Sequence, residues 1–171
     1  MTPPTLETER LLLRPLGPQD FAPLCAFYAS ERARFVGGPM NAEETWRMLA
    51  TEIGHWTLRG YGRFGVEEKS SGATVGIIGP WNPEGWPEPE IGWDLMNGFE
   101  GKGYATEAGR AALDHAYETL GWQTAISLVA EGNDGSAAVA KRLGAKADGK
   151  FTHVRWGEMT VYRHAPPGGG S

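Results

Sequence analysis

The stretch GKGYATEAG, residues 101–109, decides the fold of this protein because it joins a strand-like segment to a helical one. The run EIGWDLMN (90–97) before it alternates side chains in the manner of a strand, and residues 104–120 after it have a helical pattern. Glycines at 101 and 103 allow backbone N–H groups to approach a bound group closely. A glycine-rich turn that opens a helix typically binds an anion. The stretch therefore predicts an anion site at the start of a helix.

Two well-known phosphate-binding motifs fit this turn poorly. A Walker-type loop requires Gly-Lys-Ser/Thr, whereas here Lys102 precedes Gly103 and no Ser or Thr follows in register. A dinucleotide-binding turn requires a third glycine where Thr106 stands, and its acidic partner, Glu131, comes later than the expected ~20 residues. The chain after residue 90 is also too short for a doubly wound sheet. A nucleotide-dependent oxidoreductase is thus the least favoured alternative.

Length, composition and charge restrict the class of protein. A chain of 171 residues is expected to form one domain, residues 1–164, followed by a disordered tail, residues 165–171. The net charge of −5 argues against nucleic acid as a partner. The single cysteine, Cys25, lies in a helical pattern and excludes an intrachain disulfide. No apolar run reaches the ~18 residues that a membrane span needs. A cytoplasmic protein without a membrane partner is expected.

The hydrophobic periodicity predicts an alternation of strands and helices along the chain. Asn41 is expected to cap the longest helix in the first half. The order predicts a mixed sheet with helices on both faces. The expected strands are residues 10–16, 62–69, 73–81, 89–96, 122–131 and 152–164, the last as a strand or hairpin, and the expected helices are 18–30, 41–60, 104–120 and 133–144.

The segment GFEGKGYATEA (98–108) resembles motif A of the GNAT acetyltransferase superfamily, written (Gln/Arg)-x-x-Gly-x-(Gly/Ala). Gly103 and Ala105 match this motif, whereas Glu100 stands where glutamine or arginine is usual. The segment TERLLLRPLGPQDF (8–21) is similar to the first strand of the Rim-type branch, whose best-known members acetylate the N-termini of ribosomal proteins.

A third segment, EGNDGSAAVAKRLGAK (131–146), resembles the Asn-x-x-Ser…Leu-Gly-Phe segment of that branch, with Ala145 in place of phenylalanine. The three segments together cover about residues 6 to 163. The resemblance implies a GNAT fold, a mixed and mostly antiparallel sheet flanked by helices, with acetyl-CoA as co-substrate and no metal. Lys141 and Arg142 are candidates for the 3′-phosphate of the coenzyme, although solvated charges are the simpler interpretation. The residues expected to hold the coenzyme are Trp93, Leu95, Gly101, Lys102, Gly103, Tyr104, Ala105, Thr106 and Asn133.

Acetyl transfer to an amine requires a base for the ammonium and benefits from an acid for the departing thiolate. Glu90 is the predicted base, with Asp94 and Glu131 in reserve, although a solvated glutamate on a strand edge is an open alternative. The tyrosine that many GNAT members use as the acid is replaced by Ala140. Ser136 is the remaining candidate acid, and an ordinary first-turn helix serine is the alternative.

The loop PWNPEGWPEPEIGW (80–93) carries three tryptophans among glutamates. Trp81, Trp86 and Trp93 with Glu84, Glu88 and Glu90 form either a cradle for a cation or a set of core tryptophans beside a polar loop. The four histidines lack the spacing of metal ligands, so no metal site is expected.

The combined interpretation is an N-acetyltransferase that acts on a primary amine, either a small molecule or a protein N-terminus. Transfer is expected to be direct, within a ternary complex, because Cys25 lies far from the turn and no other activated nucleophile is visible. A non-catalytic acyl-CoA sensor is the alternative from another class. A homodimer would suit the Rim-type branch.

Overall fold

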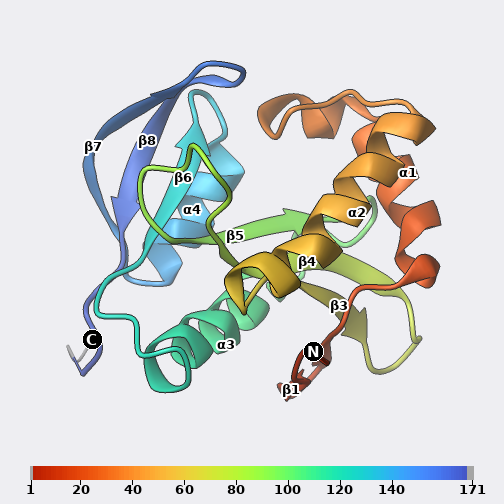
Figure 1. Ribbon diagram of the computed structural model, residues 1–171, viewed down its shortest axis with the longest axis horizontal. Helices are drawn as coiled ribbons and strands as arrows, with labels where there is room; N and C mark the ends of the chain where they lie inside the picture. The colour runs from red at the N-terminus through yellow and green to blue at the C-terminus, as the bar shows by residue number, and fades with distance from the viewer. Residues whose placement is uncertain (1, 169–171) are drawn as a thin grey trace.

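The computed structural model describes residues 2–168, so the last three residues of the expected tail, 169–171, lie outside the described residues. Eight strands form a single sheet in the order β1-β2-β3-β4-β5-β6-β8-β7 (Figure 1). All neighbours are antiparallel except β5 and β6, which are parallel. The strands are β1 (Leu6–Glu7), β2 (Leu11–Arg14), β3 (Phe64–Glu68), β4 (Thr74–Trp81), β5 (Glu90–Leu95), β6 (Ile126–Ala130), β7 (Lys146–His153) and β8 (Gly157–Arg163).

Among residues 2–168, four α-helices and two 3₁₀ helices lie beside the sheet (Figure 1). Within residues 2–168, none of these helices has the length and apolar character needed to cross a bilayer. The α-helices are α1 (Phe21–Tyr28), α2 (Ala42–Arg59), α3 (Tyr104–Glu118) and α4 (Asp134–Arg142), and the 3₁₀ helices are η1 (Pro18–Asp20) and η2 (Glu31–Phe35).

Helices cover both faces of the sheet, as predicted, and each face has its own core. Ile77 and Ile78 are adjacent on β4 and point to opposite faces. Ile78 belongs to the core that contains Leu113 of α3, whereas Ile77 belongs to the core that contains Leu24 of α1 and Leu49 of α2. Small residues allow α3 to lie close to the sheet: Ala105, Ala108, Ala112 and Ala116 are all buried.

Local signals in the sequence placed the ends of most elements well. Asn41 caps α2 as predicted, because its side chain accepts a hydrogen bond from the amide of Glu44 at 2.9 Å. The C-terminal region was predicted less well. The expected strand or hairpin at 152–164 is a hairpin, but its first strand, β7, begins earlier, at Lys146. The sequence did not indicate this start because most of β7 is exposed and lacks an alternating pattern. The two-residue β1 was also missed.

The parallel strands β5 and β6 determine where the site lies. Within the described residues they pair only at Glu90 and Ile126, and beyond this point they diverge (Figure 1). On its other edge β5 pairs with β4 along its whole length, and β6 pairs with β8. The divergence leaves one edge of β5 without a strand partner, next to the turn that opens α3.

Candidate active site

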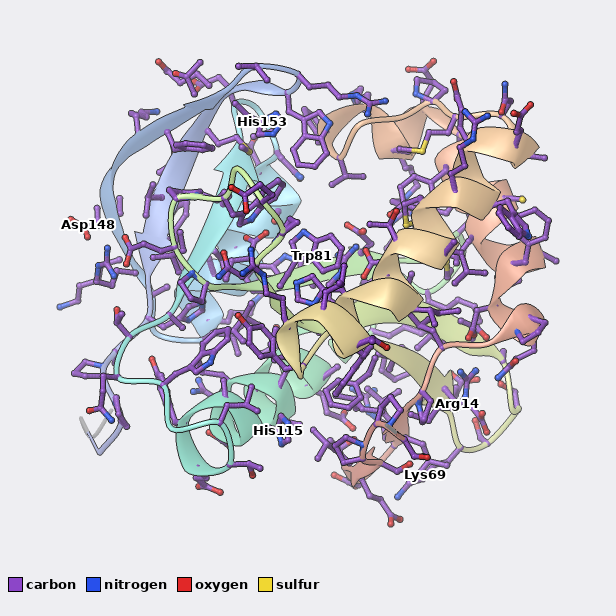
Figure 2. The ribbon with its side chains drawn as sticks, viewed as in Figure 1. Arg14, Lys69, Trp81, His115, Asp148 and His153 are labelled. Carbon is purple, nitrogen blue, oxygen red and sulfur yellow. The ribbon has the colours of Figure 1, made fainter. Side chains whose placement is uncertain are left out.

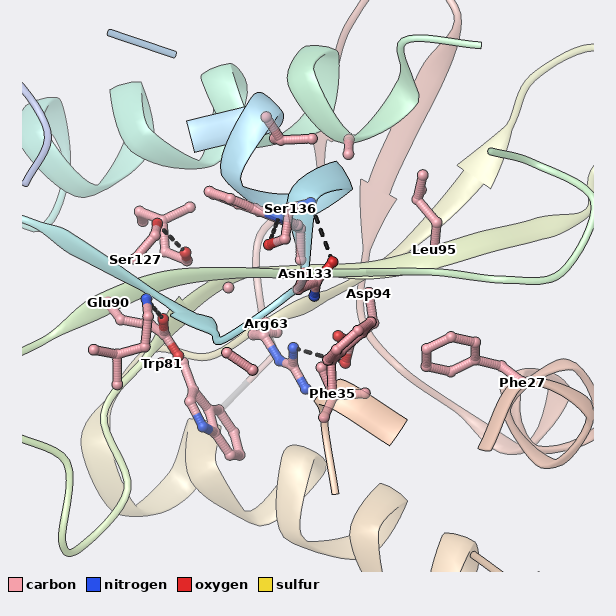
Figure 3. Close-up of a pocket in the computed structure, with 18 of the residues that line it drawn as sticks. Phe27, Phe35, Arg63, Trp81, Glu90, Asp94, Leu95, Ser127, Asn133 and Ser136 are labelled. Carbon is pink, nitrogen blue, oxygen red and sulfur yellow. Dashed lines mark hydrogen bonds and ion pairs between the residues drawn. The ribbon is translucent and has the colours of Figure 1, made fainter. Parts of the chain in front are cut away.

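A cleft of about 1340 Å³ lies where β5 and β6 diverge (Figure 3). Its walls on one side come from β5, β6, the turn before α3 and the first turns of α4. Its walls on the other side come from α1, η2, α2, the loop 82–89 and the β7–β8 hairpin. Arg10 also lines the cleft, so residues from all three segments that suggested an acetyltransferase contribute to one cavity.

The turn before α3 exposes backbone donors to the cleft. Gly101 and Gly103 have φ angles of 76° and 80°, a left-handed conformation that favours glycine. Gly103 is the N-cap of α3 and supplies no side-chain acceptor, and the first amides of a helix have no intrahelical partner. The cleft is lined by Gly101, Gly103, Tyr104, Ala105 and Thr106, whereas the ammonium of Lys102 lies over the ring of Phe99 at 5.4 Å.

Two arginines lie around this turn, and each is paired with a glutamate: Arg10 with Glu107 at 2.7 Å and Arg32 with the unusual Glu100. Glu100 forms an ion pair with Arg32 at 2.8 Å. A hydrogen bond to its own backbone amide and the charge of Arg32 lower the pKa of Glu100. Arg10, which the sequence did not single out, stacks over Tyr104 at 4.4 Å, and its Nη2 lies 3.5 Å from where a Cβ of Gly103 would be. The turn therefore has an arginine beside it.

Glu90 lies at the apex of the divergence, where its carboxylate ties the two strands together. The carboxylate accepts hydrogen bonds from Trp86 Nε1 at 2.9 Å and from the backbone amide of Leu128 at 2.8 Å. The side chain is buried, so the alternative of a solvated glutamate on a strand edge is wrong. Burial raises the pKa of Glu90 to about 7, although both donors oppose the shift. A carboxyl with this pKa exchanges a proton readily near neutral pH.

The two reserve carboxylates have different surroundings. Asp94 lines the cleft and accepts hydrogen bonds from Tyr28 at 2.8 Å and from Arg63 at 3.1 Å. Glu131 is exposed, lies 3.4 Å from Lys150, and its side chain lies outside the main cleft. The structure thus brings Asp94, but not Glu131, to Glu90.

The first turn of α4 places Ser136 at the cleft. The Ser136 hydroxyl accepts a hydrogen bond from Trp93 Nε1 at 2.9 Å, and its amide donates to the N-cap side chain of Asn133 at 3.3 Å (Figure 3). Because the indole N–H is the donor, the hydroxyl proton of Ser136 remains available to a group in the cleft. Ala140 lies in a small apolar cluster against which the Trp93 ring packs. Trp93, Leu95, Asn133 and Ser136 all line the cleft.

The structure also reveals a buried charged network that sequence reasoning missed. Arg63 donates to both carboxylate oxygens of Glu52. It also donates to Asp94 (Figure 3), which in turn accepts from Tyr28. Burial raises the pKa of Glu52 and the charge of Arg63 opposes this rise. Burial alone would lower the pKa of Arg63, but Glu52 and Asp94 outweigh it. Four separate elements supply these residues, so no local pattern marks them.

The three tryptophans of the loop do not form one cradle. Trp81 stacks on His55 at 4.5 Å, and the Arg63 guanidinium lies 5.1 Å from its ring (Figure 2). The Trp93 side chain points towards α4, on the opposite side of β5 from Trp81. Trp86 remains beside Glu90.

The other loop glutamates are engaged by arginines at the surface. Glu88 forms an ion pair with Arg163 at 2.7 Å, and Glu84 lies 3.6 Å from Arg59. The alternative of a cradle made of three tryptophans and three glutamates is therefore wrong, and the Trp86–Glu90 contact is the part of it that forms.

The remaining candidates are the histidines and the two residues considered for the 3′-phosphate. His55 contacts the Tyr61 carbonyl through Nδ1 and the Asn82 amide through Nε2. Within the described part of the chain, no three His, Cys, Asp or Glu side chains are grouped as metal ligands. Of the two residues considered for the 3′-phosphate, Arg142 lines the cleft and Lys141 is exposed outside it.

Comparisons with known proteins agree with this geometry. Residues 10–146 match the model of the acetyltransferase (GNAT) domain. An acetyltransferase of known crystal structure from Agrobacterium tumefaciens strain C58 is 39% identical, with a TM-score of 0.88 and 96% of each chain covered. The putative ribosomal N-acetyltransferase YdaF of Bacillus subtilis is 30% identical over 151 residues, 83% of this chain and 81% of YdaF.

A more distant structure has the same fold. RimL, a ribosomal L7/L12 alpha-N-protein acetyltransferase solved in complex with coenzyme A, is 18% identical, with a TM-score of 0.73 and coverage of 94% of this chain and 97% of RimL. The predicted fold class is confirmed. This chain belongs to the GNAT acetyltransferase family, with Rim-type enzymes among its relatives, and is an N-acetyltransferase.

Proposed function

We propose that this enzyme transfers the acetyl group of acetyl-CoA directly to a primary amine within a ternary complex, without a metal. One observation carries the proposal: β5 and β6 diverge with the buried Glu90 at the apex, and the turn that opens α3, whose N-cap Gly103 has no capping side chain, follows the other end of β5. A thioester in this opening would have a base at one end and an anion site at the other.

The residues around the opening fit the parts of the coenzyme. The amides of residues 101–106 would bind the pyrophosphate at the positive end of α3, and Arg10 would add a charge. The edge of β5 that lacks a strand partner, from Trp93 to Leu95, would pair with the amides of the pantetheine arm, with the Leu95 carbonyl already accepting a hydrogen bond from Arg32 at 2.9 Å. Asn133 and Ser136 would face that arm from α4.

The chemistry divides between Glu90 and Ser136. Glu90 takes a proton from the substrate ammonium, directly or through a water molecule. The amine nitrogen then bonds to the thioester carbon, while an N–H of β5 stabilises the oxyanion. When the C–S bond breaks, the nitrogen loses its second proton, and Ser136 donates a hydrogen bond to the departing thiolate or relays that proton to it, while Trp93 holds the serine hydroxyl in place.

A thermal melt tests the coenzyme. Acetyl-CoA at a hundred times its Kd is expected to stabilise the protein by about 2.7 kcal/mol. This corresponds to a Tm increase of about 5–10 °C for a chain of this length, with NADH as the inactive control. Release of free coenzyme A that rises on addition of an amine then tests transfer. A shift with NADH alone, or release that no amine accelerates, contradicts the proposal.

The Gly103→Ala variant tests the anion site. A methyl group there would lie 3.5 Å from Arg10 Nη2 and would strain the left-handed turn that presents the amides, so the Kd for acetyl-CoA, measured by calorimetry, is expected to rise about tenfold. Gly121→Ala is the matched control, because Gly121 has a similar φ of 74° and follows α3 at its other end. Both variants lose stability from backbone strain, about 1–2 kcal/mol. Equal loss of affinity in both would contradict the assignment.

Ser136→Ala and Trp93→Phe test the thiolate donor together. Each is expected to lower kcat about tenfold, the first by removing the hydroxyl and the second by removing the indole N–H that holds it. The double variant is expected to be no slower than the slower single variant, because the two groups act as one unit. Independent, multiplicative losses in steady-state kinetics would show that Trp93 acts elsewhere.

A further inference from the structure

The half of the cleft away from α3 and α4 has an aromatic and apolar wall. Residues from α1, η2, α2, the 82–89 loop and the β7–β8 hairpin form this wall. We call this half the acceptor chamber, defined by Phe27, Phe35, Met40, Met48, Trp86 and Trp156. The same elements also contribute polar side chains to this half, among them Glu44, Thr51, Glu84 and Arg155, so the six apolar side chains form one part of its wall.

The floor of the chamber holds more carboxyl groups than cations. Three buried carboxyl groups, from Glu52, Glu90 and Asp94, face a single buried cation, Arg63, whose guanidinium already binds two of them. At the chamber's rim, Arg32 and Arg47 are paired with Glu100 at 2.8 Å and Glu43 at 2.5 Å, and Arg155 lies on the exposed hairpin.

A small space separates these charged groups on the floor. A Cβ on Gly92 would lie 3.4 Å from Arg63 Nη1 and 3.6 Å from Glu90 Oε1. The glycine therefore leaves open the position beside the Glu90 carboxylate. A group bound there would lie between the Arg63 guanidinium and the Glu90 carboxylate, so the preference for an ammonium over an anion comes from the three carboxyl groups that share this floor with one guanidinium.

The β7–β8 hairpin covers the chamber on one side. Trp156 stacks on His153 at 4.6 Å and meets the Trp86 ring edge-on at 5.0 Å (Figure 2). Its Nε1 lies so close to Gly37 that a Cβ on that residue would be 2.9 Å away. The hairpin thus contacts the segment between η2 and α2. An aromatic surface runs from Trp86 in the 82–89 loop to Trp156 in the hairpin.

We propose that the acceptor is a small primary amine with a flat aromatic body, bound as the cation, and this rests on the proposed acetyl transfer. The ammonium would sit beside Glu90 and the ring against Trp86 and Trp156. A peptide N-terminus fits less well, because its backbone amides would lose water against apolar walls without gaining partners.

Kinetics with three kinds of amine test the proposal, with release of the coenzyme thiol as the readout. The probes are 2-phenylethylamine, ethylamine as its counterpart without the ring, and hexapeptides that begin with alanine or serine. The kcat/KM for 2-phenylethylamine is expected to exceed that for ethylamine about 30-fold, from burial of the ring. It is also expected to exceed that for either peptide. Faster acetylation of the peptides, or equal values for the two amines, overturns this inference and leaves acetyl transfer standing. No turnover with any probe overturns both.

A hairpin variant locates the ring. Trp156→Ala is expected to raise the KM for 2-phenylethylamine about tenfold, since it removes part of the aromatic surface. The KM for ethylamine and the Kd for acetyl-CoA are expected to stay unchanged. Val154→Ala is the matched control, because Val154 is fully exposed on the same hairpin. An equal increase in KM for both amines would mean that Trp156 only supports the hairpin, which overturns the proposed ring site.

Discussion

The Arg63→Met variant is expected to lose about 3–5 kcal/mol of unfolding free energy at neutral pH. Methionine keeps much of the length of the side chain but removes the charge between Glu52 and Asp94. The side chains of those residues are only 1% and 5% exposed, so both carboxylates would remain buried without their cation. Chemical denaturation followed by tryptophan fluorescence measures the loss.

The pH dependence of this loss follows from the protonation of Glu52. Burial already raises its pKa above the ordinary value, and removal of Arg63 raises it further. A group whose pKa is raised on folding favours the folded state at low pH and loses that contribution as the pH rises. The destabilisation is therefore expected to be smaller at pH 5 than at pH 8.

Two controls separate the buried network from a general effect of losing an arginine. Arg47→Met removes an exposed arginine that pairs with Glu43 one helical turn away, and it is expected to cost less than about 0.5 kcal/mol. Adding Glu52→Gln and Asp94→Asn to Arg63→Met removes the stranded charges and is expected to recover part of the loss. If Arg63→Met and Arg47→Met were equally stable, the network would contribute nothing.

The Glu90→Gln variant is expected to lower kcat about 100-fold, because glutamine is no base. The Kd for acetyl-CoA is expected to stay the same, since the pyrophosphate turn is unaltered. The NH₂ group of the new side chain would face one of the two donors, either Trp86 Nε1 or the Leu128 amide. A thermal melt must therefore show that the variant is folded. Glu131→Gln, outside the main cleft, is the control and is expected to retain full activity.

The pH profile gives a second test of Glu90. A base must be unprotonated to act, so wild-type kcat/KM is expected to rise with pH and level off above an apparent pKa near 7. Glu90→Gln is expected to lack this inflection over the same range. An unchanged inflection in the variant would assign the titration to another group and remove Glu90 from the mechanism.

Much of the fold was predictable because its signals are local. The capping of α2 by Asn41 depends on residues three positions apart, and the turn before α3 depends on glycines two positions apart. The alternation along β5 correctly placed Glu90 and Asp94 on one face, with Trp93 on the other (Figure 3). β7 was underestimated because an exposed edge strand such as this one has no buried face to leave a pattern.

The sequence by itself determined the order of strands and helices, the glycine turn at the start of α3 and the identity of the candidate base, Glu90. Only the tertiary structure decided the environment of that base. Tyr28 meets Asp94 across 66 positions of sequence, and Arg10 approaches a turn more than 90 positions away. Such contacts depend on strand register and on how the helices pack across the sheet. Capping, side-chain alternation and turn geometry act over a few residues, so they carry no information about contacts at this range.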